Sequence, residues 1–99
     1  MEKTTALAMT ALVEFGYTQE EDNSLVKYKG NRPREKWEPT ETGFLRFSRD
    51  DGKWAPVPYT INEKWAKVSG LTPDEHPGCY DYVYPADYVL NVYATAVTG

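Results

Sequence analysis

The chain has 99 residues, a formal net charge of −4 and a single cysteine. A chain of this length fits one domain, spanning residues 1–99, whose modest core leaves little room for an internal substrate cavity. One cysteine excludes an internal disulfide bond and favours a reducing compartment, so we expect a cytoplasmic protein.

The apolar side chains are unusually aromatic. Ile, Leu, Val and Phe together supply only 18 residues, whereas there are three Trp and eight Tyr. Each buried aromatic side chain removes roughly 150–250 Å² from water. We therefore expect a folded domain whose core depends on aromatic rings.

The N-terminal segment predicts a helix over residues 4–15. Ala8, Leu12 and Phe15 fall on one helical stripe, and Gly16 stands where a left-handed helix stop is needed. The apolar stretch within it is short and interrupted by Glu14, so we expect a helix of the mature protein and not a signal peptide.

The middle of the chain predicts strands. Leu25, Val26 and Tyr28 indicate a strand over about 24–29, and residues 30–39, with two prolines and many charges, indicate a surface loop. Two apolar runs flank an Asp-Gly pair that tolerates the positive φ angles of a tight turn, which predicts a hairpin of strands at about 43–49 and 53–58.

The last third is less decisive. Thr60 and Glu63 match a capping box, which predicts a short helix over about 61–69. Apolar residues alternate with polar ones between Leu90 and Ala96, which favours a strand over about 88–97; a helix that starts near Pro85 is the alternative. The whole pattern predicts an α+β fold built on a small antiparallel sheet.

Charge is sorted along the chain. All eleven Lys and Arg lie between residues 3 and 67, so the last third carries acids and tyrosines without a base. Tyrosine and carboxylate side chains together suit a basic protein partner. The candidate contact residues are Asp74, Glu75, Tyr80, Asp81, Tyr82, Tyr84, Asp87 and Tyr88. The alternative is that half of these tyrosines face the core and the acids only solvate the edge.

A second interpretation rests on a basic run. Cations beside aromatic rings can hold phosphates while bases stack, so this run is a candidate nucleic-acid surface. Its residues are Lys27, Lys29, Arg32, Arg34, Lys36 and Trp37. The pI near 4.9 opposes this interpretation, because nucleic-acid binders are usually basic. A solvated loop paired with the acids at 20–22 is the other alternative.

No catalytic motif is evident. His76 and Cys79 lie three residues apart among acids, but one His and one Cys fall short of the usual three or four zinc ligands. The chain lacks a glycine-rich phosphate loop and the common hydrolase signatures. We therefore expect no enzyme activity, no metal and no cofactor. Separately, no apolar run approaches the roughly 20 residues that span a membrane.

In general profile the chain resembles small virus-encoded accessory proteins, including inhibitors of host-defence nucleases, which are often short, acidic and without motifs. This resemblance covers no specific residues. From the acidic, tyrosine-rich last third, the small core and the missing catalytic motifs, we expect a non-enzymatic protein-binding module. The resemblance suggests that such a module inhibits a larger nucleic-acid-handling protein of host defence by occupying its basic surface. The alternatives are a nucleic-acid-binding domain that uses residues 27–36 and a structural subunit of an assembly.

Overall fold

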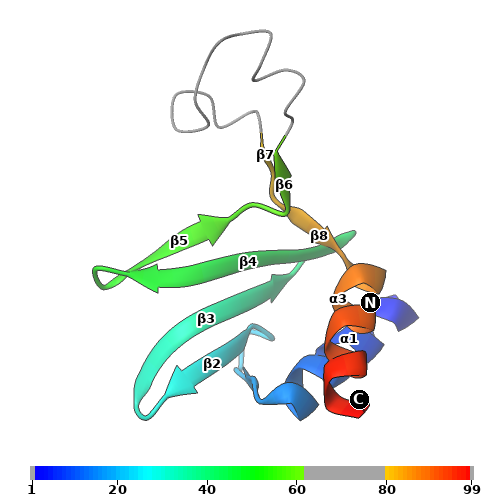
Figure 1. Ribbon diagram of the computed structural model, residues 1–99, viewed down its shortest axis with the longest axis horizontal. Helices are drawn as coiled ribbons and strands as arrows, with labels where there is room; N and C mark the ends of the chain where they lie inside the picture. The colour runs from blue at the N-terminus through cyan, green and yellow to red at the C-terminus, as the bar shows by residue number, and fades with distance from the viewer. Residues whose placement is uncertain (1, 62–79, 99) are drawn as a thin grey trace, which may run out of the picture.

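Two helices lie side by side against one end of a twisted antiparallel sheet (Figure 1). This computed structural model describes residues 2–61 and 80–98. Helix α1 spans Lys3–Phe15 and helix α3 spans Ala86–Thr98. The strands are β1 (Thr18–Gln19), β2 (Leu25–Lys29), β3 (Arg32–Pro39), β4 (Gly43–Asp50), β5 (Lys53–Val57), β6 (Thr60–Ile61), β7 (Tyr80–Asp81) and β8 (Val83–Pro85).

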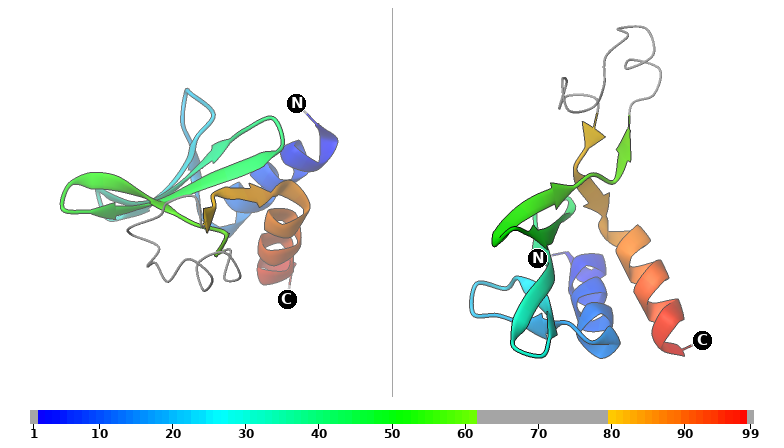
Figure 2. Two further views of the ribbon diagram at one scale, coloured as in Figure 1. Left: turned by 90° about the horizontal axis from the view of Figure 1, so that it is seen from above. Right: turned by 60° about the vertical axis from the view of Figure 1, so that its left-hand side comes forward.

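The main sheet has the strand order β1-β2-β3-β4-β5, and β8 also pairs with β4. Because β5 and β8 pair with different ends of β4, they continue one another along the same edge of that strand. Strands β6 and β7 form a separate two-stranded ribbon beside this edge (Figure 2). The α+β class predicted from the sequence is confirmed.

The two faces of the sheet have different neighbours. Register pairs Leu25 with Trp37 and Phe44 with Tyr84, and all four side chains are buried in the cluster that includes both helices. Their neighbours along each strand point to the opposite face, because side chains alternate. That opposite face, which we call the open face, has no helix from residues 2–61 or 80–98 packed over it (Figure 2).

Trp37 lies at the centre of the core. Its indole ring, 1% exposed, makes edge-to-face contacts with Tyr84, Tyr93 and Phe44, at centroid distances of 4.8, 5.9 and 6.2 Å. Arg46 lies over the same ring at 5.2 Å. The aromatic core expected from the composition thus joins β3, β4, β8 and α3 through one side chain.

Arg46 is held in place by an ion pair. Its guanidinium donates to Glu35 Oε1 at 2.6 Å, across the β3–β4 pair and on the helix side of the sheet. Burial by itself would lower the pKa of Arg46, but the hydrogen bond to Glu35 and the neighbouring Tyr93 raise it overall. Arg46 therefore stays charged while it covers the outer side of Trp37.

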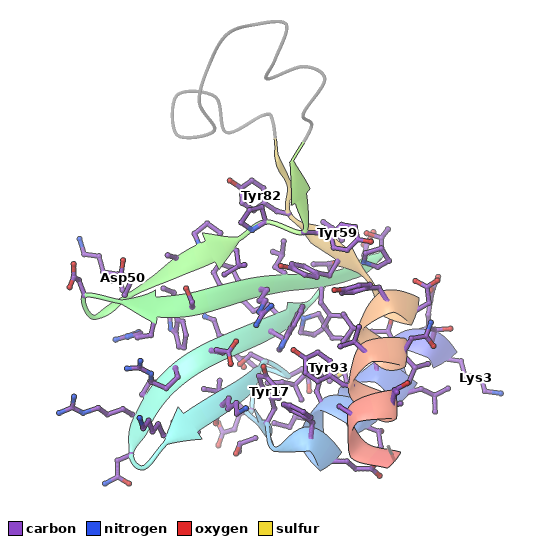
Figure 3. All side chains as sticks on the ribbon, in the orientation of Figure 1. Lys3, Tyr17, Asp50, Tyr59, Tyr82 and Tyr93 are labelled. Carbon is purple, nitrogen blue, oxygen red and sulfur yellow. The ribbon has the colours of Figure 1, made fainter. Side chains whose placement is uncertain are left out.

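Tyr17 closes the core from the end of α1. Its ring contacts Tyr93 edge-to-face at 5.9 Å, and both side chains point into the space between the helices and the sheet (Figure 3). Burial, together with Tyr93, raises the pKa of Tyr17. The indole N–H of Trp37 partly opposes the rise in the Tyr17 pKa, although it does not reach the geometry of a hydrogen bond.

The expected C-terminal strand over 88–97 is wrong, and the helical alternative is correct. Ala86, Val89 and Tyr93 are buried at helical spacing and pack against the core, so tertiary contact outweighs the period-two pattern. The opening residues Pro85 and Asp87 suit a helix start, because proline cannot donate and a carboxylate favours the N-terminal end.

The expected loop over residues 30–39 is also wrong, because most of it forms β3. Trp37 anchors this strand to the core, and Pro33 lies opposite Tyr28 beside an irregularity in register, where a missing N–H is tolerated. The strand at 24–29 and the helix at 4–15 are confirmed, within a residue or two at their ends.

The predicted hairpin is confirmed. Strands β4 and β5 pair antiparallel up to Asp50 and Lys53, and Asp51 and Gly52 take φ values of 49° and 75°. Positive φ at both central positions is the tight turn that Asp-Gly favours. The helix expected over 61–69 lies outside the described residues, except that Ile61 belongs to β6.

Gly43 allows β8 to approach β4. A Cβ atom built at this position would lie 2.0 Å from the backbone oxygen of Tyr84. Only glycine permits that distance, so the seam that leads the chain into α3 depends on this residue.

We expect Gly43→Ala to lower the free energy of unfolding by about 1–3 kcal/mol, since the new methyl group pushes β8 away from β4. Ser48→Ala, a half-buried position of the same strand, is the matched control and should cost little. Urea denaturation measures both; equal stability of the two variants would contradict the close approach.

The raised pKa of Tyr17 gives a pH dependence of stability. Below about pH 10 the phenol is protonated in both states; above it the unfolded chain ionises first, so stability falls as pH rises. We expect Tyr17→Phe to lose part of this decline. Denaturant unfolding of the unmodified protein and of Tyr17→Phe, at neutral pH and at about pH 11, measures the difference. An equal loss of stability at about pH 11 in the two proteins would contradict the raised pKa of Tyr17.

Candidate partner-binding surfaces

Two tyrosines form an exposed pair where the sheet meets α3. Tyr59 follows β5 and Tyr88 lies in the first turn of α3, and their rings meet edge-to-face at 5.1 Å. They are 39% and 42% exposed, respectively. Segments distant in the sequence therefore place two large, partly exposed aromatic side chains side by side.

Tyr84 supports this pair from beneath. It is buried, and its ring lies 5.2 Å from that of Tyr59 and 6.1 Å from that of Tyr88. Its hydroxyl donates to the backbone oxygen of Pro58 at 3.0 Å, which holds the segment before Tyr59 against β8. Burial raises the pKa of Tyr84, although Arg46 partly opposes the shift. Tyr84 thus orders the surface and does not itself present one.

Asp87 places a carboxylate next to the exposed pair. Its side chain is exposed, and Oδ1 accepts a hydrogen bond from the Tyr88 backbone N–H at 2.9 Å. This local bond restrains the carboxylate at the start of α3, where negative charge is favoured. We call Tyr59, Asp87 and Tyr88 the tyrosine patch.

The other residues predicted for partner contact are dispersed. Tyr82 is half-buried and lies on the other side of the ribbon from Tyr59 in the view of Figure 3. Tyr80 and Asp81 belong to β7, opposite Ile61 and Thr60. Asp74 and Glu75 lie outside the described residues, as do His76 and Cys79 of the metal or thiol hypothesis.

Sequence reasoning missed Tyr59. It stands in a connection after Pro58, with no periodic pattern around it, and it becomes part of a surface only because Tyr84 and Tyr88 return to it. An aromatic residue in a proline-bounded connection was the available signal.

The basic run does not form one patch. Trp37 is in the core and cannot stack on a base, which corrects that expectation. Lys27 lies over the rings of Phe15 and Tyr17, at 4.8 and 5.8 Å, on the helix side of the sheet. Lys29, Arg32 and Arg34 are exposed near the β2–β3 turn, whereas Lys36 lies on the open face.

A different aromatic surface covers the open face. Lys36 Nζ lies 4.7 Å from the Trp54 ring and 5.0 Å from the Phe47 ring, and Arg49 lies 5.0 Å from Trp54. Lys36 also pairs with Glu38 at 3.2 Å. Among the residues of this cluster, sequence reasoning assigned a binding role to Lys36 alone. The signal was the alternation that sends Phe47 and Arg49 away from Phe44.

The described residues contain no group of three or more metal-ligating side chains, and no helix in the described part of the chain is long and apolar enough to cross a membrane. Comparisons with protein-family models, curated proteins and solved structures each find no match. Functional inference therefore rests on the geometry of these surfaces.

Proposed function

We propose that the chain is a non-enzymatic protein-binding module whose partner presents basic side chains to the tyrosine patch. The observation that carries the proposal is the exposed, mutually packed pair of Tyr59 and Tyr88 beside the carboxylate of Asp87. Tyrosine provides large contact area with few rotatable bonds, and it is enriched where protein surfaces bind one another.

The arrangement suits an arginine or lysine of the partner. A cation placed over an exposed tyrosine ring gains roughly 0.5–2 kcal/mol, depending on how fully water is excluded. A carboxylate within the same patch adds a charge-assisted hydrogen bond. Because the Tyr88 ring is restrained by Tyr59 and Tyr84, little side-chain freedom is lost on binding.

Two other functions receive less support. An enzyme needs convergent reactive groups, and the tyrosine patch offers two phenols and one exposed carboxylate with no paired base among the described residues. A nucleic-acid surface built on the basic run loses Trp37 to the core and Lys27 to the helix side of the sheet.

We expect Asp87→Lys combined with Tyr88→Ala to weaken partner binding by a few kcal/mol, roughly a hundredfold, while the fold is retained. Both positions are exposed, so the fold should be retained, although the lost ring contact with Tyr59 and the cation at the start of α3 should each lower stability by roughly 0.3–1.5 kcal/mol. Affinity capture from the native cell, followed by titration of the captured protein, measures the loss.

The matched control is Leu7→Ala combined with Glu14→Lys on α1. It removes a similar apolar area and reverses one charge at exposed positions of the other helix. Binding that survives the patch variant but is lost in this control would refute the tyrosine patch as the contact surface.

A further inference from the structure

A groove crosses the open face between the two hairpins. Its main part, about 500 Å³ in volume, reaches from the β1–β2 connection to Trp54 of β5, with Val26 in its lining. A second hollow of about 310 Å³ adjoins it near the hairpin turns, and the two share Pro33 and Arg49. Pairing of β3 with β4 stops at Glu35 and Ser48, beyond which the hairpins diverge (Figure 1).

One end of this groove is acidic. Glu20, Glu21 and Asp22 all line it from the β1–β2 connection. Asp22 accepts hydrogen bonds from the backbone N–H and the hydroxyl of Ser24, at 3.0 and 2.6 Å, and these bonds lower its pKa. Glu20 accepts from the Tyr28 hydroxyl. Hydrogen bonds therefore hold the carboxylates of Glu20 and Asp22 in place, and Asp22 is ionised at neutral pH.

The other end is basic. Arg32, Arg34 and Arg49 line the second hollow, with Asp51 as the one acidic side chain among its lining residues. Between the two ends lies Trp54, with Lys36 and Arg49 over its ring. The groove thus has carboxylates at one end, an aromatic ring near the middle and guanidinium groups at the other end.

We infer that this groove binds an extended polypeptide segment of a partner, with a basic side chain over the acidic end and an acidic side chain over the arginines. Charge complementarity selects this occupant. A nucleic-acid strand carries one negative charge per roughly 3.4 Å of helix axis, so it would set phosphates against the carboxylates. A polypeptide can present both signs.

The length of β2 sets the spacing of the two charges. The β1–β2 connection precedes Leu25 and the turn to Arg32 follows Lys29, so the five residues of β2, at about 3.3 Å each, separate the two ends by roughly 15 Å, or four to five residues of an extended chain. A matching segment therefore separates its basic and acidic residues by about that number of positions. The inference rests on the proposed protein-binding function but uses a different surface from the tyrosine patch.

Two synthetic peptides of identical composition test the inference on the unmodified protein. In the first, two arginines and two glutamates stand at opposite ends of a neutral spacer of roughly four to five residues. In the second, the same charged residues alternate. We expect the first peptide to bind at least tenfold more tightly and to shift the amide and indole NMR signals of Lys36, Arg49 and Trp54.

Charge reversal makes the test specific. Arg34→Glu combined with Arg49→Glu, both at exposed positions, should weaken the first peptide at least tenfold and favour a peptide with arginines at both ends. Asp87→Lys with Tyr88→Ala should leave peptide binding unchanged. If the protein binds the first peptide more tightly than the second while the Asp87→Lys, Tyr88→Ala variant still binds the cellular partner fully, the groove is supported and the tyrosine patch is refuted.

Three results would overturn the inference. The first is equal affinity for the two peptides. The second is a set of NMR shifts confined to residues away from the groove. The third is tighter binding of an oligothymidine that the same arginine reversal abolishes, since that outcome assigns the surface to single-stranded nucleic acid.

Discussion

The indole ring of Trp37 meets the edges of rings from three other elements: Phe44 of β4, Tyr84 of β8 and Tyr93 of α3. With few aliphatic side chains available, these ring contacts join the sheet to α3. Each aromatic pair adds roughly 0.5–1.5 kcal/mol beyond the burial of area. Because the cluster sits at one end of one face, both helices gather there. Within the described part of the chain, the other face of the sheet carries no helix.

Because the helices gather on one face of the sheet, the protein presents two different surfaces, the tyrosine patch and the open face. Tyr84 has its ring against Trp37 on one side and against Tyr59 and Tyr88 on the other, so the core itself positions the tyrosine patch. On the open face no helix of the described residues covers the ring of Trp54, and the charged side chains around it keep that face compatible with water. Trp54 is half-buried, and Trp and Arg side chains are both enriched where protein surfaces bind one another.

Local chemistry predicted the elements whose signals are local. The Asp51-Gly52 turn and the apolar stripe that ends at Gly16 are both readable without tertiary information. Strand β3 and helix α3 are not readable in this way. The prolines and charges of β3 favour a loop and the alternation within α3 favours a strand, but packing around Trp37 outweighs both local signals. The sites follow the same division. Tyr88 and Asp87 were predictable as a tyrosine next to an acid. Tyr59 joins the tyrosine patch only because Tyr84 and Tyr88 return to it, and Trp54 meets Lys36 only because β3 pairs with β4.

The central claim is that the tyrosine patch is the surface that contacts a protein partner. Site-specific photocrosslinking in the native cell tests it most directly, with a photoreactive phenylalanine analogue placed at position 88 and, as the control, at position 13 of α1, where Val13 is also exposed. The account predicts one discrete protein adduct from position 88 and none from position 13. An adduct from position 13 alone, or a nucleic-acid adduct from position 88, would contradict it.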